Sequence, residues 1–252
     1  GTPDGSAPEP RWNQGGLPDI AEDADYARNG WIYLSYSHRL GQPDADGKVL
    51  AMTRVVRGRL RGNAWVDQQV VFEADPATYG DPFWHYGGRM VFDGQGRLLF
   101  SIGDRGVQEL AREPARPSGK IHRVLPDGAI PDDNPYRGRA DALPSVFSLG
   151  HRNPQGLAID PSNGRLWETE HGPRGGDELN IIERGGDYGW PVVTQGINYD
   201  GTELTPYTRA DGVKQPVHYW RPAVGVCGPA FSRGGRFPVG RHGRGTSRSM
   251  CS

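Results

Sequence analysis

The sequence predicts an all-β protein made of short strands and many turns. Its 252 residues include 38 glycines and 22 prolines, and 35% of them are hydrophobic. This composition is typical of turn-rich β folds and not of helical bundles. The sequence lacks long stretches with the apolar periodicity of an amphipathic helix, whereas short strand-like runs recur along it. Regular short strands of this kind indicate a sandwich, a barrel or a propeller.

The strand-like runs are rich in apolar and β-branched residues, and turn-forming residues separate them. In chain order the expected strands are 31–37, 49–56, 70–73, 89–92, 98–102, 120–124, 146–149, 157–159, 165–169, 179–182 and 217–220. Asp-Gly and Asn-Gly pairs, which favour tight turns between strands, stand at 46–47, 93–94, 127–128 and 163–164.

An internal similarity favours the propeller. Residues 90–100 (MVFDGQGRLLF) resemble residues 158–167 (AIDPSNGRLW), because both read as a strand, an Asp-led turn, Gly-Arg-Leu and a second strand. A polar loop containing glycine follows each copy, at 103–106 and at 171–174. A repeated hairpin that leads to a polar loop at the same end is what a β-propeller blade provides.

Charge and composition exclude several classes of function. The formal net charge is −1, so the sequence predicts no attraction to nucleic acid and none to a membrane surface. It contains no apolar run of about 18 residues, so no membrane span is expected. Gly-x-Ser-x-Gly, a phosphate-binding loop and a strand-led Gly-x-Gly-x-x-Gly are all missing from the sequence. A serine hydrolase or an NAD enzyme is therefore not expected.

The two ends of the chain differ from the rest. Residues 1–12 are polar and proline-rich and are expected to form an irregular segment, whereas residues 13–237 are expected to form the propeller. Residues 238–252 are rich in Arg and Ser. We interpret them as a disordered or non-native tail rather than as a nucleic-acid-binding one, because nothing else in the chain favours nucleic acid. The start without Met or a signal peptide predicts a processed form or a fragment.

Two polar segments could carry chemistry, and the first contains His85. His85 precedes one strand of a predicted hairpin, and Asp104 follows its partner strand, so both are expected at one end of a blade. A carboxylate beside an imidazole fixes the tautomer of the ring and raises its basicity, as a general base requires. The alternative is a structural His85 that stacks on Trp84 and Tyr86.

The second segment, residues 149–190, is dense in polar side chains between short apolar strands, which is typical of the lining of a site. Arg152 and Asn153 together suit a developing oxyanion or an anionic cofactor. The alternative is an Arg152 that ties blades together through backbone carbonyls. The stretch from His171 to Glu178 offers carbonyl and carboxylate oxygens, which suit Ca²⁺ better than zinc. Here the alternative is a turn in which Asp177 caps local N–H groups.

Longer strings of the sequence carry a family resemblance. They are NQGGL (13–17), YARNGWIYLSYS (26–37), HYGGRMVFDGQGRLLFSIGDRG (85–106), GKIHRVLPDGAIPDDNPY (119–136), LGHRNPQGLAID (149–160), EHGPRGGDELN (170–180) and GGDYGWP (185–191). In this combination and order, the chain resembles the soluble PQQ-dependent sugar dehydrogenases, the glucose/sorbosone dehydrogenase family, and particularly the aldose sugar dehydrogenases of bacteria.

The resemblance implies a six-bladed β-propeller with the cofactor PQQ over its central channel, of which this chain would hold roughly four blades. It also implies the oxidation of an aldose at its anomeric carbon to a lactone, with PQQ taking the hydride, and a periplasmic or secreted location. Family members have further sequence at both ends, so the chain is expected to be truncated at both. The preferred sugar and the electron acceptor do not follow from the resemblance.

The resemblance also implies roles for single residues. His85 matches the base that removes the proton of the anomeric hydroxyl, Asp104 matches the carboxylate that orients it, and Arg152 acts at the quinone oxygens. The residues that match the cofactor pocket are Gln14, His85, Arg152, Asn153 and His171. Gly172 and Pro173 match the pair whose carbonyls hold a catalytic Ca²⁺, which polarises the quinone. Glu178 and the backbone of Tyr188 resemble a second, structural Ca²⁺ site.

Other functions stay open. The expected loss of blades favours a non-catalytic propeller fragment without a bound cofactor. A Ca²⁺-dependent lactonase on a similar propeller would use carboxylate-rich metal ligands at its centre. The set of His85, Asp104, Arg152 and Asn153 argues against this lactonase.

Overall fold

The computed structural model describes residues 14–42, 48–81, 83–232 and 248–249. The predictions for residues 1–12, for the turn at 46–47 and for most of the tail 238–252 lie outside the described residues. The described part is almost entirely β structure, with helix α1 (Tyr26–Asn29) and short 3₁₀ turns at Pro76–Thr78 and Gln108–Arg112. None of these described helices has the length and apolar character needed to cross a membrane.

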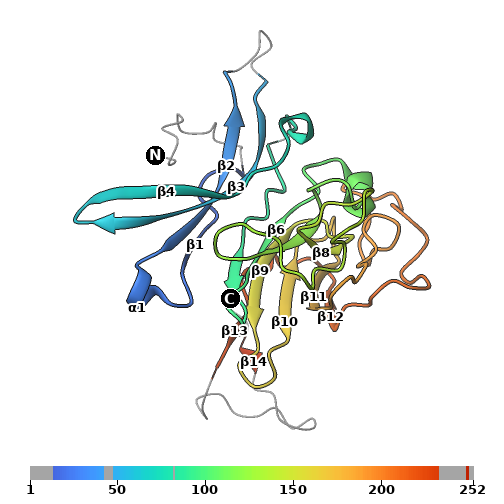
Figure 1. The fold of residues 1–252 in the computed structure, drawn as a ribbon. Helices are drawn as coiled ribbons and strands as arrows, with labels where there is room; N and C mark the ends of the chain where they lie inside the picture. The colour runs from blue at the N-terminus through green and yellow to red at the C-terminus, as the bar shows by residue number, and fades with distance from the viewer. Residues whose placement is uncertain (1–13, 43–47, 82, 233–247, 250–252) are drawn as a thin grey trace.

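Three four-stranded antiparallel sheets carry the fold, and a two-stranded sheet follows them (Figure 1). The first consists of β1 (Asp19–Glu22), β2 (Ile32–Leu40), β3 (Leu50–Arg61) and β4 (Ala64–Phe72). The second consists of β5 (Met90–Phe92), β6 (Leu98–Ile102), β7 (Lys120–Val124) and β8 (Val146–Leu149). The third consists of β9 (Pro154–Ile159), β10 (Leu166–Glu170), β11 (Asp177–Ile182) and β12 (His218–Trp220). The last pairs β13 (Ala230–Phe231) with β14 (Arg248–Ser249).

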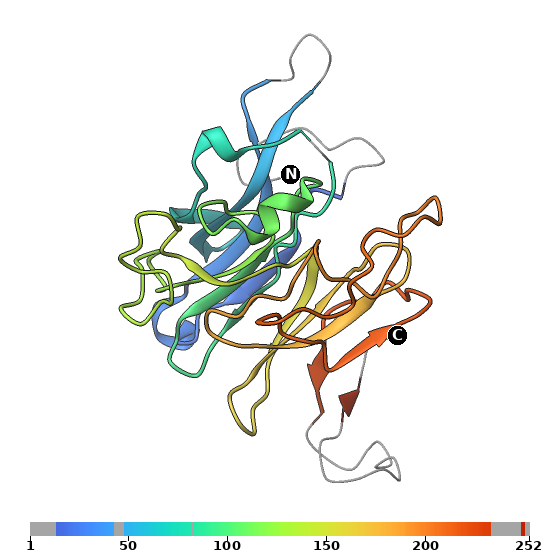
Figure 2. The same cartoon turned by 90° about the vertical axis from the view of Figure 1, so that its right-hand side faces the viewer.

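The sheets are arranged as the blades of a propeller. Within each four-stranded sheet every strand pairs with the next strand along the chain. The first strands β1, β5 and β9 are neighbours, because β5 contacts both of the others. Figure 2 shows the three sheets following one another across the molecule in chain order. The predicted all-β propeller is therefore confirmed, with three complete blades among the described residues and a two-stranded sheet where a fourth was expected.

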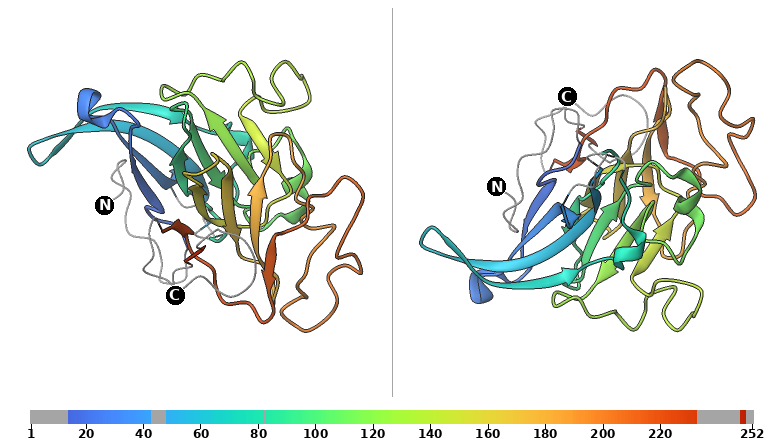
Figure 3. Two further views of the ribbon diagram at one scale, coloured as in Figure 1. Left: turned by 90° about the horizontal axis from the view of Figure 1, so that it is seen from below. Right: turned by 90° about the horizontal axis from the view of Figure 1, so that it is seen from above.

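The expected strands are present, and the differences have local causes. The prediction for 70–73 covers only the end of β4, which begins at Ala64. The outer half of β4 was missed because it faces solvent and carries polar residues such as Asp67 and Gln69. The hairpin of β3 and β4 reaches away from the body of the molecule (Figure 3). β1 was missed because its four residues, DIAE, give too short an alternation to recognise.

The second blade lies between two hydrophobic clusters. Phe100 and Leu98 of β6 belong to a cluster shared with the first blade, and Leu99 of the same strand belongs to a cluster shared with the third. Successive residues of a strand point to opposite faces of the sheet, so one strand can serve both. This explains why the sequence of β6 is continuously apolar up to Phe100. The ring of Phe100 stacks on that of His122, with the centroids 5.1 Å apart.

Truncating the buried Phe100 should destabilise the whole fold. Phe100→Ala is expected to lower the free energy of unfolding by about 3–5 kcal/mol, because it removes buried contacts and leaves a cavity. Val70→Ala on β4 is the matched control, since Val70 is 44% exposed and its truncation should cost no more than about 0.5 kcal/mol. Urea unfolding followed by circular dichroism measures both. Equal losses in the two variants would contradict the assignment of the core.

Candidate active site

The topology brings the predicted site residues to one end of the second and third blades. The chain enters β5 and leaves β6 at the same end, and it also passes from β8 to β9 and from β10 to β11 there. Backbone hydrogen bonds join these loops: the Asp104 N–H donates to the Arg152 carbonyl at 2.7 Å, and the His171 N–H donates to the Asn153 carbonyl at 3.2 Å. The loops at 85–89, 103–106, 150–153 and 171–173 therefore lie side by side at this end of the two blades.

His85 and Asp104 are directly hydrogen-bonded, with 2.6 Å between Nδ1 and Oδ1. The Asp104 side chain also accepts the Gly106 N–H and the indole N–H of Trp190, each at 2.8 Å. The carboxylate is buried, so its charge is held by these donors rather than by water. Because Asp104 accepts from Nδ1, the ring carries its proton there and presents Nε2 as an unprotonated base.

The backbone around His85 is tightly constrained. His85 has a φ of +58°, a left-handed conformation that is uncommon for residues other than glycine. Its N–H donates to Oε1 of Gln14 at 2.9 Å. Gly103 lies so close that an added Cβ would stand 2.3 Å from the His85 carbonyl oxygen. The glycine before Asp104 is thus required for the close approach of the two loops.

Burial and neighbouring charges keep the His85 ring neutral. Desolvation lowers its pKa below the ordinary 6.5, because the imidazolium loses water when the ring is buried. The Asp104 carboxylate opposes this change and raises the pKa, whereas the positive charges of Arg152 and Arg105 lower it further. The net direction is downward, so the ring is a free base at neutral pH.

Arg152 occupies the centre of the cluster. Its Nη1 donates to the carbonyls of His171 at 3.0 Å and Gly172 at 2.7 Å. The guanidinium carbon lies 5.3 Å from the ring centroid of Trp190. Its Nε is buried and has no hydrogen-bond partner within the described residues. Arg152 thus ties loops together through carbonyls, which was one of the expected readings, and keeps one unused donor for another group.

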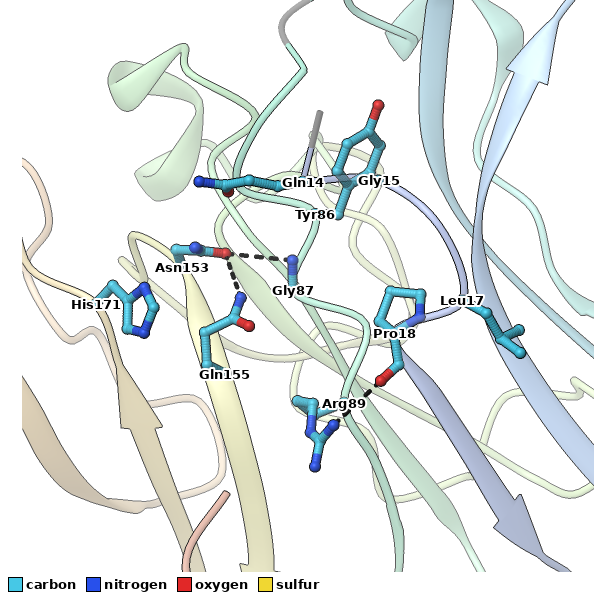
Figure 4. Close-up of a pocket in the computed structure, with 10 residues that line it drawn as sticks. All are labelled: Gln14, Gly15, Leu17, Pro18, Tyr86, Gly87, Arg89, Asn153, Gln155 and His171. Atoms are coloured by element: carbon cyan, nitrogen blue, oxygen red, sulfur yellow. Dashed lines mark hydrogen bonds between the residues drawn. The ribbon is translucent and has the colours of Figure 1, made fainter. Parts of the chain in front are cut away.

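A cavity of about 400 Å³ opens beside these residues (Figure 4). Three predicted cofactor residues line it, namely Gln14, Asn153 and His171. Asn153 is fixed there, since its Oδ1 accepts from the Gly87 N–H at 3.3 Å and from Gln155 at 2.9 Å. The volume of the cavity lies in the range of small-molecule sites, roughly 300–1,000 Å³. His85 adjoins the cavity through its hydrogen bond to Gln14.

A buried acidic cluster lies on the paired strands β10 and β11. Glu168 is opposite Asn180 and Glu170 is opposite Glu178, so the four side chains share one face. Ligand atoms of His151, Glu168 and Glu170 lie within 4.8 Å of one another. Glu168 Oε1 and Asn180 Oδ1 are buried and without a hydrogen-bond partner in the part of the chain that the structure describes.

The carboxylates of this cluster repel one another. Burial, together with the charge of Glu170, raises the pKa of Glu178 to about 8 and that of Glu168 well above its ordinary value. Glu168 is completely buried. An uncompensated group of this kind is a donor set for a hard cation, because carboxylate and amide oxygens are the ligands that Ca²⁺ prefers.

A small cavity relates the cluster to the predicted metal ligands. It measures about 10 Å³, the space of about one water molecule, and Gly172, Glu178 and Tyr188 are among its lining residues. Pro173 is buried next to Gly172. The Asp177 carboxylate accepts the N–H groups of Gly172 at 3.0 Å and of Gly225 at 2.7 Å. Asp177 therefore caps backbone groups, as the alternative interpretation had it.

Several residues of the site escaped the sequence analysis. Glu168 and Glu170 alternate along an otherwise apolar strand, and this alternation was the available signal. Gly103 and Trp190 gave no local signal, because their roles depend on contacts with other loops. Trp190 meets Asp104 across 86 residues of sequence.

Comparisons with known proteins agree on one family. The model of the "Glucose / Sorbosone dehydrogenase" family matches residues 9–242. The chain is 41% identical over 231 residues to the aldose sugar dehydrogenase YliI of Escherichia coli (strain K12), covering 89% of this chain and 60% of that protein. It thus spans about 60% of the length of this relative.

Solved structures give the same result. A crystal structure of glucose dehydrogenase has a TM-score of 0.79 at 42% identity, covering 90% of this chain and 64% of that one. The PQQ-bound form of an aldose sugar dehydrogenase from Streptomyces coelicolor has a TM-score of 0.69 at 29% identity, covering 87% and 58%. With the family match extending over most of its length, the chain belongs to the glucose/sorbosone dehydrogenase family.

Proposed function

We propose that the chain carries the base and part of the cofactor pocket of a PQQ-dependent aldose dehydrogenase. The observation that carries this proposal is the hydrogen bond between the partly buried His85 and the buried Asp104, with 2.6 Å between Nδ1 and Oδ1, beside a cavity of about 400 Å³. The PQQ-bound relative from Streptomyces coelicolor supports the choice of cofactor. The substrate would be an aldose and the product its lactone.

His85 acts as the general base in this proposal. Nε2 takes the proton of the anomeric hydroxyl, and the resulting imidazolium is stabilised by the Asp104 carboxylate at Nδ1. PQQ, when bound, supplies a quinone that accepts the hydride from the anomeric carbon. Loss of the proton and of the hydride leaves a carbon–oxygen double bond at that carbon, which is the lactone carbonyl.

The residues of the cavity fit an anionic quinone cofactor. Arg152 does not itself line the cavity of about 400 Å³, but it precedes the lining residue Asn153 and contributes a permanent positive charge and a buried Nε–H without a partner among the described residues. Gln14, Asn153 and His171 contribute neutral polar groups to the lining. These residues would bind and orient the cofactor, and Arg152 would face the oxygens on which negative charge develops.

The acidic cluster supports a Ca²⁺ ion bound through Glu178 and the Tyr188 carbonyl. Burial and the neighbouring charge of Glu170 raise the pKa values of Glu168 and Glu178, which is the state that a divalent cation relieves. A catalytic Ca²⁺ at the Gly172 and Pro173 carbonyls would polarise the quinone. The Gly172 oxygen already accepts a hydrogen bond from Arg152 at 2.7 Å, so this ion would share the oxygen with Arg152 or displace Arg152 from it.

The alternatives differ in what they require of the cavity. A lactonase would need carboxylates around a central metal, whereas amides, Arg89 and His171 are prominent in the lining described here. A non-catalytic fragment would not bind PQQ, and titration of the 252-residue chain with PQQ separates it from the proposal. A periplasmic or secreted location stays a prediction from the family.

Replacing the base should abolish sugar oxidation. The chain loaded with PQQ and Ca²⁺ is expected to reduce an artificial electron acceptor when given aldoses, and His85→Gln should lower the rate about 10²–10⁴-fold. PQQ binding, followed through the quinone absorbance, should remain saturable in the variant. His218→Gln is the control, since His218 is exposed on β12. An unchanged rate in His85→Gln would rule out this residue as the base.

The pH dependence of His85 should follow the charges around it. In the cofactor-free protein the ring is expected to titrate below pH 6.5, because burial lowers its pKa. Asp104→Asn should lower the midpoint further, since it removes the carboxylate that stabilises the imidazolium. NMR of the ring protons measures this, with His85→Gln to assign the signal and the exposed Asp211→Asn as control. A higher midpoint in Asp104→Asn would contradict the described electrostatics.

Calcium should stabilise the fold through the acidic cluster. At a concentration of about 100 times its dissociation constant, Ca²⁺ is expected to add about 2.7 kcal/mol to the free energy of unfolding. Glu178→Gln should reduce this gain, whereas Glu203→Gln, at an exposed position, should keep it. Thermal unfolding with and without a chelator measures the effect. A gain of equal size in both variants would remove Glu178 from the metal site.

A further inference from the structure

We propose that Trp190 is a positioning residue for the base: its indole N–H fixes the Asp104 carboxylate and thereby sets the orientation and basicity of His85. This inference rests on the proposed function of His85 as general base. Trp190 itself lies behind Asp104 and acts through it.

The hydrogen bond between Trp190 and Asp104 has the geometry that this role requires. The indole Nε1 lies 2.8 Å from Oδ2 of Asp104, and the bond is buried. Trp190 is 6% exposed and Asp104 is 1% exposed. The other carboxylate oxygen, Oδ1, receives the His85 ring and the Gly106 N–H. With a donor on each oxygen, the carboxylate is fixed in rotation and aimed at Nδ1.

The indole is held from a different part of the chain. The backbone N–H of Trp190 donates to the Gly150 carbonyl at 2.9 Å, which ties the turn that carries the indole to the loop that carries Arg152. The same ring lies below the guanidinium of Arg152, with 5.3 Å from the guanidinium carbon to the ring centroid. One side chain thus contacts both the carboxylate behind the base and the cation of the cofactor pocket.

The indole N–H should also lower the basicity of His85. The indole N–H of tryptophan is a hydrogen-bond donor only, so its positive end lies next to the Asp104 carboxylate. It partly offsets the negative charge that this carboxylate exerts on the His85 ring. The charged groups that act on His85 are Asp104, Arg152 and Arg105. Because the N–H of Trp190 has the same electrostatic sign as the two arginines, its removal should raise the pKa of His85.

Trp190→Phe tests this role, because it deletes the N–H and keeps an aromatic ring under Arg152. In the cofactor-free protein the titration midpoint of His85 should rise by about 0.5–1 pH unit, the equivalent of one neutral hydrogen bond. In the loaded protein kcat should fall about tenfold with little change in KM, because binding contacts are kept while the base loses its alignment. Trp220→Phe on β12 is the matched control and should change neither quantity.

A second measurement leaves Trp190 unaltered. The indole N–H resonance of Trp190 should move along the His85 titration curve, and Asp104→Asn should abolish this movement. This second measurement tests the proposal even when the Trp190→Phe variant does not fold. An unshifted His85 midpoint in a folded Trp190→Phe, or an indole signal indifferent to the titration, would overturn the positioning role.

The outcomes also separate this inference from the proposed function. One outcome is a raised titration midpoint of His85 in Trp190→Phe together with full activity of His85→Gln. This outcome would show that His85 is not the base, so the contact of Trp190 with Asp104 would have no role in catalysis. An unchanged midpoint together with an inactive His85→Gln would overturn the role of Trp190 and leave the base in place.

Discussion

The carboxylate of Asp104, a residue that is only 1% exposed, connects the loops of the second and third blades. Burying such a charge costs several kcal/mol unless hydrogen bonds replace the lost water. His85, Gly106 and Trp190 supply those bonds from separate parts of the chain. The conformation of the His85 loop, the close approach at Gly103 and the position of the Trp190 turn all serve to bring donors to this one charge.

The acidic cluster on β10 and β11 shows the opposite arrangement. Glu168 is also buried and Glu178 is half-buried, but their neighbours are other carboxylates, His151 and a single amide, Asn180. Burial and the charge of Glu170 raise their pKa values, whereas three donors form hydrogen bonds with the Asp104 carboxylate. The same blade end thus combines a carboxylate that is hydrogen-bonded to His85 with a group of carboxylates that we propose as the cation site.

Most of the strands could be predicted because apolar runs and Asp-Gly turns are local signals. The proximity of His85 and Asp104 was also predictable, since one hairpin separates them. Other features have no local signal. β1 is too short to show a pattern, and the contact of Trp190 with Asp104 depends on how one blade packs against the next. The occupation of the Gly172 carbonyl by Arg152 likewise depends on three-dimensional packing, so the sequence could suggest both metal binding and loop tethering there without choosing.

The donors to Asp104 come from two different blades, so motion of one blade relative to the other affects them. His85 and Gly106 come from the second blade, whereas Trp190 follows β11 of the third. A small rigid-body rotation of one blade against the other lengthens the indole bond while every strand ladder stays intact. The alignment of His85 is thus more sensitive to the relative position of the blades than the strand pairing within each blade is. Loss of the His85–Asp104–Trp190 contacts and loss of the fold are therefore expected to be separate events.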